Sequence, residues 1–131
     1  MGDYVPIYKS GAALPATVGA TALVGGNVVT LSAAGGPQTI GTVIPSTAAS
    51  GLSIGVASTD AAVGTRTTIL RGGVHELVAS AAITALAPLK SAAGGQVTVM
   101  TIGTDPQDQL IGYALTAATA AGQLIRVLWV K

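Results

Sequence analysis

Glycine recurs along a chain that is otherwise rich in threonine, valine, isoleucine and alanine. There are 18 glycines among 131 residues, and short runs of β-branched side chains, such as 28–31 and 65–70, lie between them. Short strands separated by turn residues about every 8–12 positions are typical of all-β sandwiches and barrels. The pattern therefore predicts an all-β fold, a small barrel or sandwich-like domain with at most one short helix.

Charged side chains are scarce. They make up 8% of the chain, against about 25% in an average globular domain, and none occurs between Lys9 and Asp60. A net charge of +1 gives no electrostatic footprint for nucleic acid and no polybasic membrane signal. We therefore expect no nucleic-acid or membrane partner. A surface with so little charge is poorly soluble alone, so we expect much of it to be covered in an oligomer or assembly.

The chain divides into an extended N-terminal arm, residues 1–12, and one β-rich domain, residues 13–131. Within the arm, Tyr4 to Tyr8 has an extended pattern, and Pro6 confines it to an edge strand or a docking arm because proline lacks a backbone N–H. Residues 79–87 are predicted to form a turn or a short helical piece that ends at Pro88. Strands are expected at 16–23, 28–31, 39–44, 53–58, 65–70, 74–78, 88–91, 96–101, 110–115 and 124–130.

A weak internal repeat is present. Residues 54–59, IGVAST, parallel residues 111–116, IGYALT. Each segment is followed by an alanine-rich connection, a glycine (Gly64 or Gly122) and a further strand. We interpret the repeat as two copies of a strand–turn–strand unit in which a glycine lets one backbone pass close to another. The alternative is a chance likeness in a chain built from few residue types.

No group of residues predicts catalysis. The chain has one histidine, five acidic residues and no cysteine. His75 and Glu76 are neighbours on a predicted strand, so they point to opposite faces. Asp105 and Asp108 are spaced as in a polar turn, without the glycine and terminal glutamate of a calcium loop. We expect no enzyme activity, no metal site and no cofactor.

The aromatic residues are few and scattered. Tyr4 and Tyr8 share one side of an extended segment, and Trp129 is either a core anchor or an interface residue. Large aromatic side chains are over-represented among binding hot spots. The residues predicted as a possible oligomer interface are Arg71, His75 and Trp129.

Several short motifs resemble those of a known family. They are an opening segment, residues 4–11 (YVPIYKSG), and glycine-containing segments at 54–57, 71–74, 89–95 and 111–115, together with Gly64. On these motifs the chain resembles the tailed-bacteriophage capsid decoration, or cement, proteins over nearly its whole length. The sequence differs from the family in its very low charge and its alanine-rich segment 79–87.

The resemblance implies a β-rich protein on the outer surface of the phage capsid. It implies a homotrimer that binds the major capsid protein of an expanded head and clamps neighbouring capsomers. A carbohydrate- or surface-binding β-module displayed on the virion is the alternative, with Tyr113 and Trp129 as its candidate aromatics. Strand addition to an edge of the shell is the expected mode of capsid binding, through the arm residues Tyr4, Val5, Pro6, Ile7 and Tyr8.

Overall fold

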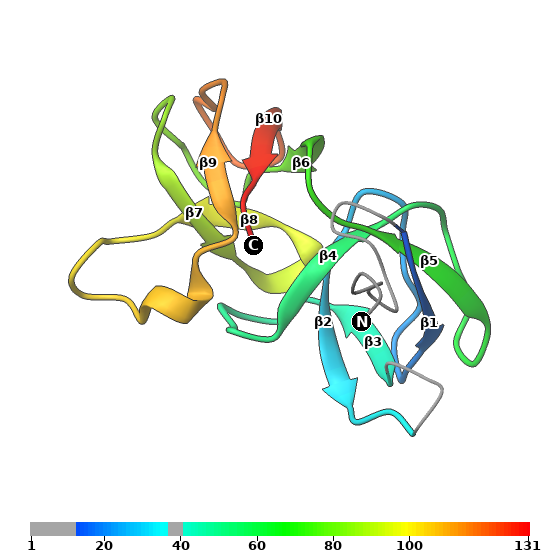
Figure 1. The fold of residues 1–131 in the computed structure, drawn as a ribbon. Helices are drawn as coiled ribbons and strands as arrows, with labels where there is room; N and C mark the ends of the chain where they lie inside the picture. The colour runs from blue at the N-terminus through cyan, green and yellow to red at the C-terminus, as the bar shows by residue number, and fades with distance from the viewer. Residues whose placement is uncertain (1–12, 37–40) are drawn as a thin grey trace, which may run out of the picture.

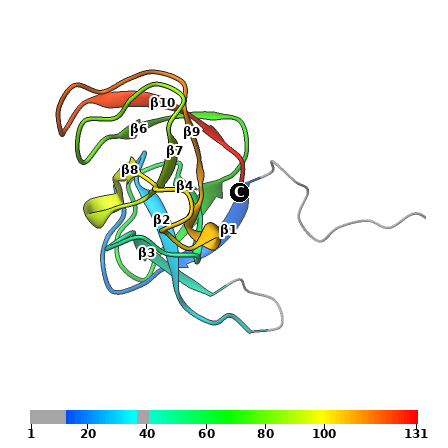
Figure 2. The ribbon, with the colours of Figure 1, turned by 90° about the vertical axis from the view of Figure 1, so that its left-hand side faces the viewer.

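The computed structural model describes residues 13–36 and 41–131, and its strands form two groups in separate halves of the molecule (Figures 1 and 2). The helical elements of this described part are two short 3-10 turns, η1 (Ala93–Gly95) and η2 (Gln107–Gln109). The first group of strands contains β1 (Leu14–Val18), β2 (Val28–Ala33), β3 (Thr42–Pro45), β4 (Ser53–Ala57) and β5 (Arg66–Leu70). The second contains β6 (Val74–Val78), β7 (Pro88–Ser91), β8 (Val97–Val99), β9 (Gly112–Ala114) and β10 (Leu124–Trp129).

The first group is a closed barrel, which we call the first barrel. Its strand order is β1-β3-β2-β4-β5, and β1 closes it by pairing parallel with β3 and antiparallel with β5. The second group, the second sheet, has the order β6-β10-β9-β7-β8. A parallel bridge between Ala79 and Val97 joins the two ends of this sheet. The all-β prediction is confirmed.

The second sheet repeats the first barrel strand for strand. The antiparallel pairs β1–β5, β4–β5, β2–β4 and β2–β3 recur as β6–β10, β9–β10, β7–β9 and β7–β8. The repeat predicted from residues 54–59 and 111–116 is therefore confirmed, and it extends to all five strands of each half. Equivalent residue pairs include Val28–Val56 with Pro88–Tyr113, Val29–Gly55 with Leu89–Gly112, and Val18–Val43 with Ala79–Val97.

Glycines have two different roles at equivalent places in the two halves. A Cβ atom on Gly55 in β4 would lie 2.5 Å from a carbonyl oxygen of β5, and one on Gly112 in β9 would collide with a carbonyl oxygen of β10. Gly64 and Gly122 have open space around them and φ angles of 81° and 87°. They form turns in the left-handed region. The close approach predicted at Gly64 and Gly122 therefore occurs at the other two glycines.

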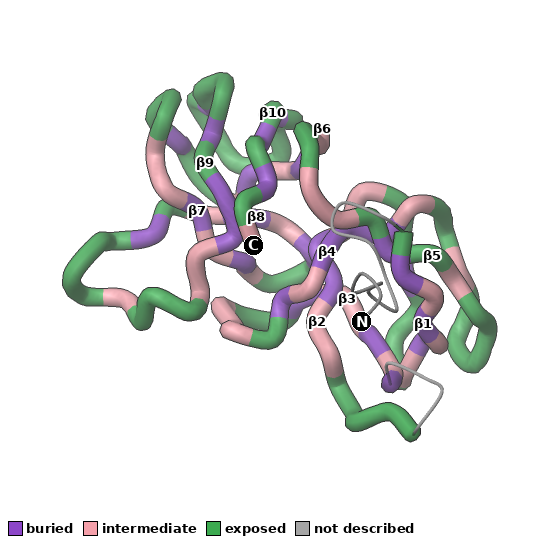
Figure 3. Tube along the Cα trace, viewed as in Figure 1, coloured by how far each residue is buried: buried purple, intermediate pink, exposed green. Residues whose placement is uncertain are grey.

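Each half has its own buried core (Figure 3). The core of the first barrel is built from the inward-facing residues Leu14, Ala16, Val18, Leu23, Val29, Val43, Ala57 and Ile69. The core of the second sheet contains Leu77, Leu89, Ile111, Ile125 and Trp129, and it also takes in Val28 and Val56 from the first barrel. The two halves therefore share one apolar seam.

The segment 79–87 forms a turn, the first of the two predicted alternatives. Ile83 exchanges two backbone hydrogen bonds of 2.9 Å with Ala118, so its amide and carbonyl serve the sheet instead of a helix. The chain then turns at Ala85–Leu86 and enters β7 at Pro88.

The predicted arm, residues 1–12, lies outside the described residues, and so do residues 37–40. The division into an arm and a domain at 13–131 therefore stays a prediction. The strand expected at 39–44 is described from Thr42, where β3 begins.

Candidate interaction surfaces

The three residues predicted as a possible oligomer interface lie close together near the C-terminus. The rings of His75 and Trp129 meet edge to face with centroids 6.3 Å apart. Trp129 Nε1 and Arg71 Nη2 both donate to the carbonyl oxygen of Lys131, at 3.0 and 3.3 Å. Trp129 is only 3% exposed, so within one chain its indole is a core anchor. The role of the three residues between copies stays a prediction.

The outer face of the second sheet carries an apolar row. Cross-strand pairing places Val74, Leu128, Tyr113 and Pro88 next to one another across β6, β10, β9 and β7. Val74 is 53% exposed, and Leu128 and Tyr113 are 39% and 38% exposed. Contiguous exposed apolar side chains of this size mark an interaction surface more often than a solvated one.

Further apolar side chains extend this row. Leu86, Leu115 and Leu124 are all exposed large hydrophobic residues. Charge on this face comes from Arg126 and Glu76, whose side chains are 3.9 Å apart and largely exposed. Such an ion pair contributes little to stability. The face as a whole is therefore suited to an apolar partner.

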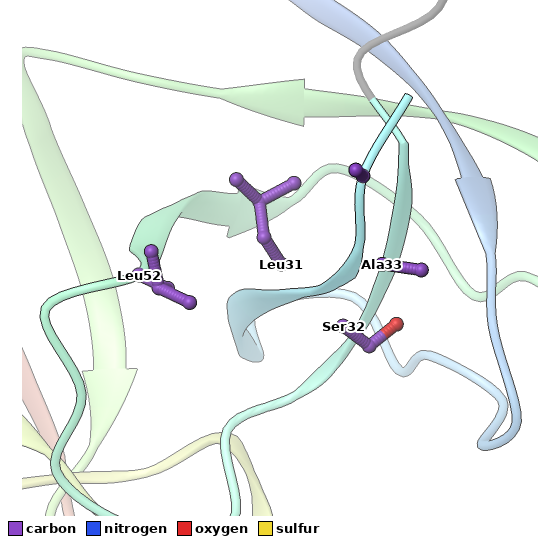
Figure 4. A pocket seen from close by; sticks show the side chains of 5 residues that line it. Leu31, Ser32, Ala33 and Leu52 are labelled. Carbon is purple, nitrogen blue, oxygen red and sulfur yellow. The ribbon is translucent and has the colours of Figure 1, made fainter. Parts of the chain in front are cut away.

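The first barrel carries an open apolar pocket of about 340 Å³, which we call the β2 pocket (Figure 4). Leu31 donates its amide to the carbonyl oxygen of Leu52 at 3.1 Å, which holds the two leucines beside each other. Among the described residues no charged side chain lines it, so it suits an apolar side chain better than an ionic ligand. Its lining residues are Leu31, Ser32, Ala33, Ala34 and Leu52.

Buried serines connect the two halves at the seam. Ser46 donates to the carbonyl oxygen of Ala92 at 2.6 Å. Ser91 donates to the carbonyl oxygen of Ala48 at 2.9 Å and accepts from the hydroxyl of Ser53 at 3.0 Å. Buried hydroxyls are costly unless they are paired. These pairings therefore specify one relative position of the two halves.

Asp105 holds the loop between β8 and η2. Its Oδ2 accepts from the amide of Thr101 at 2.8 Å and from Lys90 Nζ at 2.9 Å. These two hydrogen bonds, the backbone one first, lower the pKa of the Asp105 carboxyl below its ordinary value of 3.8. The carboxylate is the form that fixes this loop.

Lys131 holds the same loop to the first barrel. Its Nζ donates to the carbonyl oxygens of Gly51 and Asp108, both at 2.6 Å. Burial lowers the pKa of the Lys131 amine, and the nearby Asp108 carboxylate opposes that shift. The C-terminal residue therefore joins both halves of the molecule.

In residues 13–36 and 41–131, no group of three or more His, Cys, Asp or Glu side chains is arranged to hold a metal ion. The same part of the chain has no helix with the length and hydropathy that crossing a bilayer requires.

Comparison with known proteins identifies the family. The family model described as "phage cement protein" matches residues 3–129. The chain belongs to the phage cement protein family. This cement protein is therefore a capsid-associated structural component of the virion, as the resemblance implied. No curated protein matches its sequence.

The fold of the cement protein has a solved counterpart in another phage. The N base of the head fiber protein gp8.5 of bacteriophage phi29 superimposes with a TM-score of 0.67 at 18% identity. The match covers 91% of this chain and 93% of that chain. At this identity the likeness shows a shared fold.

Sequence reasoning missed both apolar surfaces of the cement protein. The β2 pocket has no motif, because small residues such as Ala33 and Ala34 line it. The outer row on the second sheet joins residues that are far apart in the chain, such as Val74 and Tyr113. The internal repeat could have predicted the row, if we had extended it to every strand and so aligned the strands of the second sheet.

Proposed function

We propose that the cement protein is a homotrimer that binds the outer surface of an expanded phage head and clamps neighbouring capsomers. The match of residues 3–129 to the phage cement family carries this proposal. The proposed partner is the major capsid protein. The scarcity of charge and the exposed apolar row support a protein that works within an assembly.

The proposed mechanism is differential affinity. Packaged DNA presses outward on a thin shell, and a protein that binds only the expanded lattice stabilises that lattice by mass action. Each contact can be weak, because a trimer that touches several capsomers gains avidity from its linked sites.

The arm is the proposed capsid contact. Tyr4, Val5, Pro6, Ile7 and Tyr8 form an extended pattern in which Tyr4 and Tyr8 share one side. An extended segment of this kind can add as a strand to an exposed edge, with its side chains giving specificity. The proposal rests on the sequence of these residues, which lie outside the described part.

Binding to purified heads tests the proposal. The full chain should co-sediment with emptied expanded heads, raise the temperature at which they break, and leave unexpanded heads unbound. Deletion of residues 2–9 should abolish binding while the oligomer stays folded. Unchanged binding by the deletion variant would refute the role of the arm, and no binding by the full chain would refute the function.

The alternative of a glycan-binding module has weaker support. Such modules use exposed aromatic side chains, and within the described residues Trp129 is buried and Tyr113 alone is exposed. Glycan-array binding that is lost in a Tyr113→Ala variant would favour this alternative.

A further inference from the structure

The seam between the two halves has a defined set of contacts on the first barrel. Val28 and Val56 face each other across β2 and β4, and both are buried in the core of the second sheet. Gly26, in the turn before β2, lies near β6, since a Cβ atom there would be 3.8 Å from the Glu76 carbonyl oxygen. We call Gly26, Val28 and Val56 the packing face.

The second sheet has the same three positions, and they are uncovered. By the register of the repeat, Leu86, Pro88 and Tyr113 correspond to Gly26, Val28 and Val56. We call these three residues the free face. Leu86 is 73% exposed and Tyr113 is 38% exposed, whereas the two valines are buried. The surface that joins the two halves of one chain is therefore repeated on the second sheet, where Leu86 and Tyr113 are exposed and Pro88 is half-buried.

Leu86 is strained as well as exposed. Its φ is 67°, and it is the single non-glycine residue with a positive φ in the described ranges. A left-handed conformation costs a leucine roughly 1–2 kcal/mol, and the equivalent turn of the first barrel uses Gly26 instead, with a φ of 88°. A strained apolar side chain that contributes nothing to the core points to a role in binding.

The part of the second sheet that contacts the first barrel at the seam also has an equivalent in the first barrel. The second sheet receives the first barrel at residues 91–94, where Ala92 and Gly94 accept hydrogen bonds of 2.6 and 3.4 Å from first-barrel side chains. A bulge between Leu31 and Ala33 inserts one residue in β2, so the equivalent positions of the first barrel are Leu31 and 33–35. Of these, Leu31, Ala33 and Ala34 line the β2 pocket. An apolar pocket is therefore open at the place where a second packing face would fit.

We infer that the free face of one copy of this chain docks at the β2 pocket of a second copy, repeating the seam between molecules. The two surfaces differ, so the contact is head-to-tail, and such contacts form a closed ring where the rotation between copies allows it. The residues that form the two surfaces are apolar, and the neighbouring charges on the face of the second sheet are the paired Arg126 and Glu76. The inference rests on the self-association in the proposed function, but not on capsid binding.

Cysteine cross-linking tests this contact directly, because the chain has no cysteine of its own. Asn27 Nδ2 donates to the Gly94 carbonyl oxygen across the seam, and the equivalent positions are Ala87 and Gly35. A mixture of the Ala87→Cys and Gly35→Cys proteins under mild oxidation should form a disulfide-linked dimer containing one of each. Each variant alone should stay uncross-linked. Cross-linking of either variant alone, or none in the mixture, would overturn the inference.

A second variant separates binding from folding. Leu86→Gly removes both the strain and the anchor. It should keep the midpoint of urea unfolding of the dissociated protein at or above that of the unaltered chain, and weaken association by at least about tenfold in a dilution series followed by sedimentation velocity. Val63→Ala changes another exposed apolar residue, at a turn of the first barrel outside both proposed surfaces, and it should leave association unchanged. Association of Leu86→Gly as tight as that of the unaltered chain would contradict the inference.

Head binding distinguishes the two proposals. If the mixed cysteine variants do not cross-link but the full chain binds expanded heads, the head-to-tail contact is wrong and the proposed function stands. If they cross-link but no head is bound, the contact stands and the proposed function is wrong.

Discussion

Replacing Gly112 by alanine should destabilise the protein far more than replacing a turn glycine. A Cβ atom there would collide with the Leu128 carbonyl oxygen and lie 3.3 Å from the Trp129 Cα. Both are backbone atoms of β10, so the strands themselves must separate. Overpacking costs about 1–3 kcal/mol, and each weakened ladder hydrogen bond adds about 1 kcal/mol. We expect a total loss of about 2–4 kcal/mol, a large part of the roughly 5–15 kcal/mol that stabilises a domain.

Thermal unfolding followed by circular dichroism measures this loss, at one fixed protein concentration. A domain of this size loses about 4 °C in Tm per kcal/mol, so Gly112→Ala should lower Tm by about 8–16 °C. Gly122→Ala is the matched control, because its φ is 87° and no atom lies within 4 Å. It should cost only about 1 kcal/mol, from the backbone conformation. Equal Tm values for the two variants would show that the close approach of β9 and β10 is not tight.

Three further changes test the contacts that hold the halves together. Ser91→Ala leaves the Ser53 hydroxyl without its acceptor and should cost about 1–3 kcal/mol in urea unfolding; an unchanged midpoint would show that the seam tolerates the loss. The stabilisation from Asp105 is present above its unfolded pKa and is lost as pH falls through its lower folded pKa, below 3.8. The protection factor of the Thr101 amide against hydrogen exchange should therefore fall in acid, and Asp105→Ala should show the low protection already at pH 7; full protection in that variant would refute the hydrogen bond. Lys131→Met should speed proteolysis at loop 101–110, and an unchanged cleavage rate would show that Lys131 does not hold the loop.

The all-β class was predictable because alternating β-branched residues and glycine turns specify strands locally. The repeat was recognised at 54–59 and 111–116, and a second pair, the identical SAAGG segments at 32–36 and 91–95, was missed. Elsewhere equivalent positions hold different residues, such as Leu31 and Ser91. A strand register depends on which residues face inward, and not on their identity. The pairing of all five strands therefore needed the structure.

The candidate surfaces were less predictable than the fold. The sequence alone could not decide whether Trp129 is a core anchor or an interface residue, because an alternating strand at the end of a chain fits both. The structure places it in a core beside Val127. The sequence did not predict the positive φ of Leu86, because a turn that requires a positive φ normally contains a glycine at that position.

The connection between the two halves is short: β5 ends at Leu70 and β6 begins at Val74, with Gly72 and Gly73 both at positive φ between them. A linker of this length keeps the halves at a high effective concentration, so a small set of contacts, which includes the serine hydroxyls, two valines and the Lys131 amine, is enough to hold them together. A contact of the same kind between separate molecules has no such linker. On a capsid lattice, the high local concentration of bound copies would take the place of the linker. The fraction of lattice sites occupied by the protein would then rise steeply once neighbouring sites were filled.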